Sequence, residues 1–325
     1  MKCKLVIGID VSKRTLDMHI KPVGATLQIT NDLAGFMILK KQVTPHSEVL
    51  VVMEHTGLYS RKLELFLHSH RIAFCKVPAL EIKRSLGVVR GKNDRIDATR
   101  IAEYAWLRRG QLIPTLIIPE DMERLNHLLS MRAKLVKDRS GYLSRLKELK
   151  SATSGSVEKL LLKSHRTVIE MLTKQIGVME SGILTIIQGN EDYQKTFLLL
   201  TSMKGVGKIV AAKMIAVTTN FTKFSNARKF NCYAGLAPFK HESGTSIRGR
   251  ARVSHLANKD IKTMLNLSAF CAVRLDAELK QYYQRRVAEG KAKMACINII
   301  RSKIVARMFA IIKRQQPYQS IPAAA

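Results

Sequence analysis

The sequence predicts an N-terminal α/β domain followed by two mostly helical regions, and three observations support this division. Over residues 1–115, short β-rich runs alternate with helical stretches, which is typical of an α/β domain. Residues 116–192 are charged and amphipathic with helical periodicity. Residues 193–325 are helical again around one glycine-rich, basic loop. We therefore expect an α/β domain, a helical hairpin arm of the coiled-coil type, and a C-terminal, mostly helical domain.

The α/β domain is expected to contain five strands and two helices. The segments KLVIGID, LDMHIKP and ATLQIT predict a three-strand antiparallel meander. EVLVVMEHTG predicts a fourth strand, which is apolar almost throughout and is therefore expected to be central. The remaining expected elements are a helix at RKLELFLHSH, a strand at RIAFCKVPA and a helix at NDRIDATRIAEYAWLRR.

Two long helices are expected in the arm. Leucines recur at helical spacing from Leu125 to Leu149, and a second periodic run extends from Val157 to Ile187 after a breaker at residues 151–156. These runs predict an antiparallel helical hairpin. It could serve as a dimerisation arm or as a support for nucleic acid, and a solvated structural hairpin explains the periodicity equally well.

The charge of the chain indicates a polyanionic partner. Lys and Arg number 55 against 25 Asp and Glu, a net charge of +30, which is too large for an ordinary enzyme of small neutral metabolites. No stretch approaches the roughly 18 consecutive apolar residues of a membrane-spanning helix, and the N-terminal segment lacks the features of a signal peptide. The five cysteines form no CxxC pair, which argues against a zinc site or a disulfide framework. We expect a cytoplasmic protein that binds nucleic acid and no membrane.

Four acids stand where strand ends and a helix start can bring them together: Asp10, Glu54, Asp94 and Asp97. Carboxylate oxygens suit Mg²⁺ or Mn²⁺, and two such ions can activate a nucleophile and stabilise the leaving oxygen of a phosphodiester. Each acid alone also has a structural interpretation, since Asp is common at turns and helix starts. Clustered carboxylates repel one another unless cations offset them. The four together therefore predict a metal site.

A loop rich in hydroxyl groups, glycines and cations is expected from Phe239 to Ser254. Glycines let a backbone approach a phosphodiester closely, and arginines donate paired hydrogen bonds to its oxygens. Ser243 in this loop needs a metal, a base or arginine-stabilised charge to become a nucleophile. From the local sequence alone, contacting a phosphate or capping a helix is the better interpretation of this serine. The cations expected to bind nucleic acid here are Lys240, Arg248, Arg250 and Arg252.

A glycine turn between two helical runs resembles a helix-hairpin-helix. Gly205 and Gly207 are flanked by Lys204 and Lys208, and the backbone amides of such a turn can contact a nucleic-acid backbone without reading bases. A tight turn between helices is the alternative. Several aromatic residues could stack on bases, but core packing is the preferred interpretation for them. They are Trp106, Phe221, Phe224, Tyr282 and Tyr283.

Three segments in order, GIDVSK, MEHTG and KNDRIDA, resemble a known family. They are similar to the RuvC-like, ribonuclease-H-fold domain of the DEDD transposases of the insertion-sequence one-ten family, also called bridge-RNA-guided recombinases. The resemblance continues in KGVGKIVAAKM, ARKFNCYAGLAPFKHESGTSIRGRARVSH and NKDIKTMLNLSAFCAV, so it covers nearly the whole chain. One departure is Ser254-His255, where relatives tend to carry Ser-Lys, and no catalytic role is assigned there.

The resemblance implies roles for the acids and the serine. Asp10, Glu54, Asp94 and Asp97 would be metal ligands, and Ser243 would be the nucleophile of a serine recombinase. The implied function is a DNA transposase that cleaves and rejoins double-stranded target and donor DNA, guided by a structured RNA that pairs with both. The family also implies assembly as a dimer or tetramer with an active site completed between protomers. The sequence has no GxxxxGK[ST] motif, which agrees with strand exchange that needs no ATP.

Two other functions fit parts of the pattern. A RuvC-like, structure-specific endonuclease would use the same acids with water as the nucleophile and would leave Ser243 a structural role. A non-catalytic scaffold that binds RNA or DNA would keep the fold but would not need the acids. The presence of all four acids argues against the scaffold.

Overall fold

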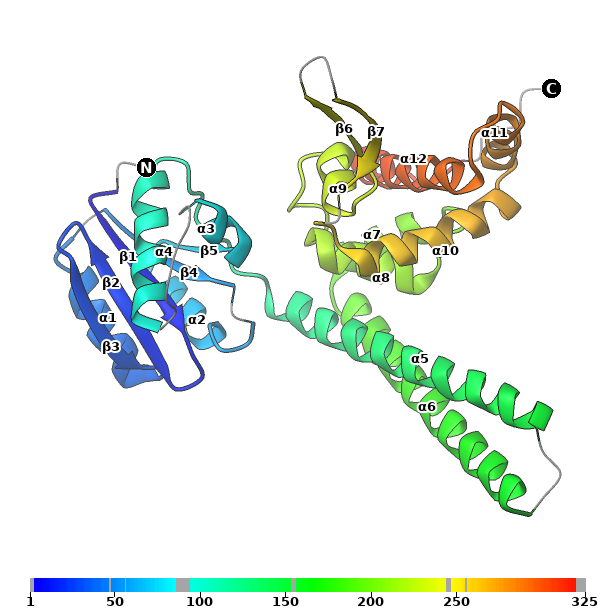
Figure 1. The fold of residues 1–325 in the computed structure, drawn as a ribbon, viewed down its shortest axis with the longest axis horizontal. Helices are drawn as coiled ribbons and strands as arrows, with labels where there is room; N and C mark the ends of the chain where they lie inside the picture. The colour runs from blue at the N-terminus through cyan, green and yellow to red at the C-terminus, as the bar shows by residue number, and fades with distance from the viewer. Residues whose placement is uncertain are drawn as a thin grey trace. The chain divides into compact units, whose positions relative to one another are not determined.

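The computed structural model describes most of the chain in seven ranges. They are residues 3–46, 48–55, 57–85, 94–152, 156–243, 247–254 and 256–319. The chain divides into two compact units, Met1–Ile117 and Ile118–Ala325. Figure 1 shows the elements of each unit.

A five-stranded mixed sheet forms the first unit, in the order β3-β2-β1-β4-β5. The strands are β1 Leu5–Val11, β2 Thr15–Lys21, β3 Ala25–Thr30, β4 Val49–Glu54 and β5 Phe74–Val77. The first three strands are antiparallel, whereas β4 runs parallel to both β1 and β5. The predicted meander and the interior position of the fourth strand are confirmed. This is a ribonuclease-H-like sheet.

Helices connect and cover this sheet. They are α1 Leu33–Val43, α2 Arg61–Ser69, α3 Ala79–Ser85 and α4 Asp94–Arg108. The second and fourth were predicted, whereas α1 and α3 were not. The start of α1 has a recognisable signal, because the Asp32 carboxylate accepts a hydrogen bond from the backbone N–H of Gly35 at 3.0 Å and caps the helix.

The two faces of the sheet carry different helices, because successive side chains of a strand point to opposite faces. Ile7 of β1 belongs to the core that includes Phe36 of α1 and Leu67 of α2. Val6, the preceding residue, belongs to the core that includes Ile101 of α4. Thus α1 and α2 cover one face and α4 covers the other (Figure 1).

α4 lies unusually close to β1 at one point. A Cβ atom added to Gly8 of β1 would lie 2.7 Å from both the Cα and the Cβ of Ala102, which is itself fully buried in α4. Carbon atoms in packed interiors stay about 3.5–4.0 Å apart, so a larger residue at either position would push the helix away from the sheet. The two small residues therefore set the position of α4 over β1.

The second unit begins with the helical hairpin, formed by α5 Glu120–Ala152 and α6 Ser156–Gln188 (Figure 1). Leu135 of α5 packs with Leu172 and Ile176 of α6. Nearer the base of the hairpin, the Nε of Arg132 on α5 donates a hydrogen bond to an Oε of Glu180 on α6 at 2.7 Å. The predicted antiparallel hairpin is confirmed, and residues 153–155 of the predicted breaker lie outside the described residues.

Six further helices and one hairpin complete the second unit. They are α7 Glu191–Thr201, α8 Lys208–Thr218, α9 Ala227–Tyr233, β6 Pro238–Ser243, β7 Ile247–Val253, α10 Lys259–Leu275, α11 Ala277–Ala288 and α12 Lys293–Arg314. Their core also includes Leu125 of α5 and Ile183 of α6, so the base of the arm belongs to it. Within the described part of the chain, none of the helices combines the length and the apolar character needed to cross a membrane.

The prediction of a loop from Phe239 to Ser254 is wrong, because this segment contains the antiparallel strands β6 and β7. Ser243 pairs with Ile247, and the register shifts between Phe239 and His241. In IRGRARV a cation occupies every second position, which is the two-residue period of a strand. The glycines and hydroxyl residues nearby favoured a loop and concealed this period. Residues 244–246 lie outside the described residues.

The contact between Gly8 and Ala102 gives a stability prediction. Gly8→Ala places a methyl group against the α4 backbone, so we expect a loss of about 1–3 kcal/mol in the free energy of unfolding of the first unit. Circular dichroism during chemical unfolding measures this loss. Gly110→Ala is the matched control, because a Cβ at Gly110 meets no atom within 4 Å. Equal stability of the two variants would contradict the inferred role of Gly8.

Candidate active site

Two of the predicted acids lie side by side at the ends of parallel strands. Ile9 of β1 is level with Met53 of β4, so the next residues, Asp10 and Glu54, are also neighbours. Strand alternation places both acids on the face of the sheet that α4 covers. Both carboxylates are half-buried. The end of two adjacent strands therefore presents two carboxylates toward the same helix.

The other two predicted acids begin that helix. Asp94 is exposed and Asp97 is half-buried, and both lie in the first turn of α4. An Oδ of Asp97 accepts a hydrogen bond from the Arg100 guanidinium at 2.8 Å. A helix N-terminus stabilises negative charge, because its free N–H groups and its dipole point toward it. Since α4 packs on β1 at Gly8, its first turn lies near the end of that strand.

The pKa of Asp10 is raised by its surroundings. Burial is the largest cause that raises its pKa, followed by the negative charges of Asp94, Asp97, Glu54 and Asp17. Together they raise the pKa of Asp10 to about 6. Three of the acids singled out from the sequence, Glu54, Asp94 and Asp97, therefore act electrostatically on the fourth, Asp10. A divalent cation at this cluster would relieve the repulsion that acts on Asp10.

The chemistry of the donor set fits a hard divalent cation, because all the groups are carboxylates. Among the described residues, however, no three Asp, Glu, His or Cys side chains are arranged to hold one metal ion. Residues 86–93, just before Asp94, lie outside the described residues. The assignment of the four acids as ligands therefore stays a prediction.

A fifth acid, Asp17 of β2, acts on Asp10 and was not among the predicted site residues. It lies directly opposite Asp10 in the β1–β2 ladder and is 2 % exposed. Both of its carboxylate oxygens accept hydrogen bonds from the Gln28 side-chain amide, each at 3.1 Å. A signal for Asp17 was present, because an acid within the apolar strand TLDMHIK needs a partner when it is buried.

The serine and most of the cations predicted near it are placed by their backbone alone. Ser243 is the last residue of β6, and the structure describes no side chain for it or for Lys240, Arg248 and Arg250. Arg252 is exposed on β7, opposite Phe239. The nucleophilic role of Ser243 and the binding roles of the cations stay predictions.

The predicted helix-hairpin-helix glycines have different surroundings. Gly205 has a φ of +88°, and a Cβ there would lie 2.8 Å from the Cβ of Ala272 on α10. This supports the tight-turn interpretation for Gly205. Gly207 precedes α8 in open space, and Lys204 and Lys208 are exposed beside it. Contact between this turn and nucleic acid stays a prediction.

The preference for core packing over base stacking is confirmed for the aromatic residues. Phe221, Phe224, Tyr282 and Tyr283 are partly buried against the core of the second unit. Trp106 packs against the α4 side of the sheet.

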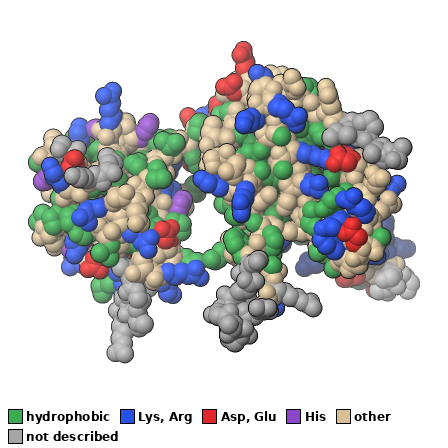
Figure 2. Space-filling model, turned by 90° about the horizontal axis from the view of Figure 1, so that it is seen from above, with side chains coloured by type: hydrophobic (Ala, Val, Ile, Leu, Met, Phe, Trp, Pro, Cys, Tyr) green, Lys and Arg blue, Asp and Glu red, His purple; other side chains and the backbone are tan. Residues whose placement is uncertain are grey.

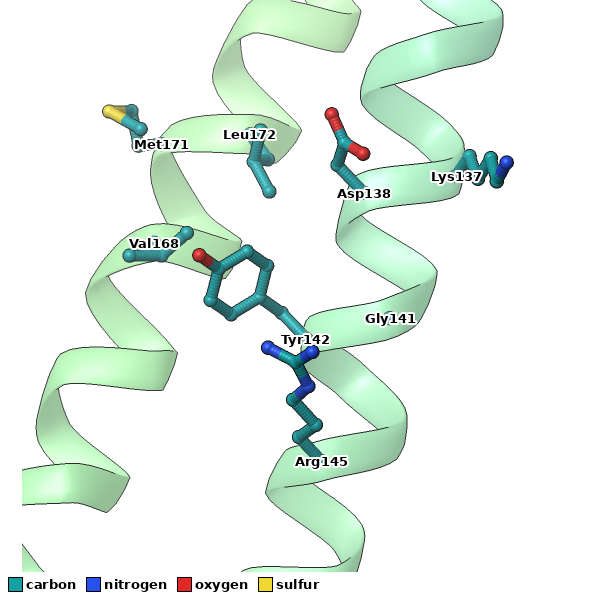
Figure 3. Close-up of a pocket in the computed structure, with 8 residues that line it drawn as sticks. All are labelled: Lys137, Asp138, Gly141, Tyr142, Arg145, Val168, Met171 and Leu172. Carbon is teal, nitrogen blue, oxygen red and sulfur yellow. The ribbon is translucent and has the colours of Figure 1, made fainter.

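A pocket of about 500 Å³ lies between the helices of the arm (Figure 3). Tyr142 and Leu172 form part of its lining, and Asp138 is its one carboxylate among two cations, Lys137 and Arg145. One carboxylate does not make a site for a hard divalent cation, so this pocket is not the candidate active site.

A ribonuclease-H-like sheet with clustered acids at its strand ends defines a class of metal-dependent, nucleic-acid-processing enzymes. Comparison with known families narrows the class. Residues 7–151 match a family model described as "Transposase" of the DEDD type, and residues 198–284 match the "Transposase IS116/IS110/IS902 family". The chain belongs to this family of transposases, which are enzymes that cleave and join DNA. The family implies DNA binding and a metal-dependent active site.

Individual relatives align along most or part of the chain. The "Pilin gene-inverting protein" of Moraxella bovis is 26% identical over 327 residues, covering 97% of this chain and 98% of the relative. The "Insertion element IS116 uncharacterized 44.8 kDa protein" of Streptomyces clavuligerus is 21% identical over 389 residues, covering 98% of this chain and 97% of the relative. An insertion element IS110 protein of Streptomyces coelicolor is 34% identical over 122 residues, covering 38% of this chain and 30% of the relative.

The raised pKa of Asp10 gives a prediction about pH and metal. Because folding raises this pKa from its ordinary 3.8 to about 6, Asp10 stabilises the fold below pH 3.8, and this contribution is lost as the pH rises through 6. Without metal, Asp10→Asn should therefore raise the melting temperature at pH 7.5 more than at pH 5. Mg²⁺ should raise the melting temperature of the unaltered protein and leave Asp10→Asn unchanged.

Differential scanning fluorimetry with and without Mg²⁺ at both pH values measures these shifts. Asp138→Asn, an exposed acid on α5, is the matched control and should retain the response to Mg²⁺. An equal Mg²⁺ response in Asp10→Asn and the unaltered protein would exclude Asp10 from the metal site.

Proposed function

We propose that this protein is a serine recombinase that cuts and rejoins DNA strands. Ser243 is the nucleophile, and Asp10, Glu54, Asp94 and Asp97 hold the metal. The observation that supports this most strongly is the electrostatic coupling of Asp10 to the other three acids on one face of a ribonuclease-H-like sheet. Such a cluster destabilises a fold by repulsion unless a cation neutralises it, so its presence favours a catalytic role.

The proposed reaction conserves phosphodiester bonds. When bound at the four carboxylates, Mg²⁺ or Mn²⁺ supplies charge neutralisation for the phosphate oxygens and lowers the pKa of an attacking hydroxyl. The Ser243 hydroxyl gives up its proton as its Oγ bonds to phosphorus. The bond from phosphorus to one deoxyribose oxygen breaks, and that oxygen leaves as a hydroxyl after taking up a proton. A hydroxyl of the incoming strand then attacks the phosphoserine and releases Ser243.

We assign a separate role to the basic surface, which is to bind the DNA backbone. The net charge is +30, and Figure 2 shows Lys and Arg side chains widely distributed on the viewed face with fewer acids between them. Cations that contact phosphates give affinity that does not depend on sequence. We therefore assign DNA holding to cations such as Lys204, Lys208 and Arg252, and chemistry to the acids and the serine.

We further propose that a structured RNA selects the DNA sites by pairing with both the target and the donor. The family resemblance in both halves of the chain supports this role. An RNA guide would supply the base reading, as in other guided systems, while the protein contacts the backbone. The Moraxella relatives are named for gene inversion. The same exchange of strands inverts or inserts a segment according to how the two sites are placed.

The active site is proposed to be shared between protomers. The acids belong to the first unit and Ser243 belongs to the second. An enzyme that completes its site only when assembled on paired DNA sites avoids stray cuts, because binding energy is needed to bring the two halves together.

A covalent adduct distinguishes serine attack from attack by water. End-labelled substrate DNA should shift to a protein-linked band on a denaturing gel, and Ser243→Ala should abolish this band because it removes the Oγ proposed to bond to phosphorus. Ser254→Ala is the matched control and should keep the adduct, since the Ser254 hydroxyl accepts a local hydrogen bond from the N–H of Leu256. Cleavage without any adduct in the unaltered protein would indicate a water-dependent endonuclease.

Mixing two inactive variants tests the shared site. Asp94→Ala should abolish strand transfer while leaving DNA binding largely intact, because cations rather than acids hold the backbone. Mixed with Ser243→Ala, it should recover recombination, since each variant contributes its intact half. Recombination is measured by amplification across the new junction. No recovery in mixtures shown to contain mixed oligomers would mean that each protomer builds its own site.

A further inference from the structure

A buried arginine in the second unit has no acidic partner among the residues that the structure describes. Arg301 of α12 is 5 % exposed. One Nη donates to Asn266 of α10 at 2.8 Å, and the other donates to Asn298 at 3.4 Å. The Nε is buried without a hydrogen-bond partner. No Asp or Glu within the described ranges forms an ion pair with this guanidinium.

A second cation lies close to Arg301. Lys262 of α10 has a pKa lowered first by burial and then by the positive charge of Arg301. Burial also lowers the pKa of Arg301. Two like charges partly removed from water destabilise a fold unless an anion is close to them. Packing therefore does not explain why α10 and α12 bring these two side chains together.

Another arginine on the same helix shows how this unit neutralises a structural cation. Arg307, also on α12, forms ion pairs with Asp276 at 3.2 Å and with Glu278 at 2.7 Å. Its side chain is 19% exposed. Arg307 is thus provided with two carboxylates, whereas the described partners of the more deeply buried Arg301 are two neutral amides. The difference indicates that the counter-charge of Arg301 comes from a ligand.

The surroundings connect this pair to the hairpin that carries Ser243. The Asn298 side chain, which accepts from Arg301, donates its Nδ2 to the backbone carbonyl of Leu236 at 2.8 Å. Leu236 lies two residues before the start of β6. An anion held by Arg301 would therefore lie close to the segment that leads into the proposed nucleophilic strand.

We propose that Arg301 and Lys262 form a binding site for a phosphate of a nucleic-acid backbone, between α10 and α12. The half-buried ammonium group of Lys262 contacts the phosphate, and the guanidinium of Arg301 is the fixed positive charge behind it. The proposal rests on the DNA binding that the family implies. It requires neither the RNA guide nor the serine chemistry.

Salt-dependent binding of the full chain tests this site. Fluorescence anisotropy with a random-sequence DNA duplex, repeated over a range of salt concentrations, gives the slope of log K against log salt. Arg301→Met and Lys262→Met should each weaken binding at low salt and reduce that slope by about 0.9, the value for one phosphate contact with duplex DNA. Arg307→Met is the matched control, because its charge is already neutralised, and its slope should equal that of the unaltered protein.

Thermal melting separates this role from a structural one. Arg301→Met removes a buried, unpaired charge, so its melting temperature should equal or exceed that of the unaltered protein, whereas Arg307→Met should melt lower. Arg301→Lys should keep most of the salt slope because it keeps the charge. A parallel titration with a folded RNA hairpin identifies the source of the phosphate. A reduced salt slope for DNA alone or for RNA alone assigns the site to that nucleic acid. Unchanged slopes for both nucleic acids in Lys262→Met and in a folded Arg301 variant would overturn the proposal.

Discussion

The close contact between Gly8 and Ala102 is the constraint on which the candidate active site depends. It fixes α4 against β1 on the face of the sheet that also presents Asp10. The acids of α4 lie in its first turn, and their charges act on Asp10. A pair of small residues with no chemistry of their own therefore helps to hold the start of α4 where its acids act on the end of β1. The opposite face, filled by α1 and α2, supplies the rigid support.

The two units contain opposite electrostatic conflicts. In the first unit, burial and the neighbouring carboxylates raise the pKa of Asp10, and the buried Asp17 lies directly opposite it in the β1–β2 ladder. In the second unit, Arg301 and Lys262 bring like positive charges together without a described acid beside them. Each arrangement lowers the stability of the free protein, and each would be relieved by a ligand of opposite charge. Lower stability of the ligand-free protein is expected at functional sites rather than in hydrophobic cores.

Much of the fold could be predicted because hydrophobic periodicity is local. The five strands, α2, α4 and the arm all follow from runs of apolar residues with a clear period. α1 and α3 were missed although Asp32 supplies a capping signal, and β6 and β7 were mistaken for a loop because glycines obscured the alternation in IRGRARV. The four predicted acids could be named from strand ends and a helix start. Asp17 had a weaker signal, as an acid within an apolar strand, but its place opposite Asp10 depends on strand pairing. Arg301 could not be named, since its significance depends on what surrounds it in space.

The β6–β7 hairpin has a further consequence for the free protein. In a sheet of two strands, both strands are edges, and each has a row of backbone N–H and C=O groups available to pair with another chain. β7 has arginine at every second position from Arg248 to Arg252. Charges along an edge strand discourage pairing with a like-charged copy, so the same arginines act as a guard against aggregation through the strand edges.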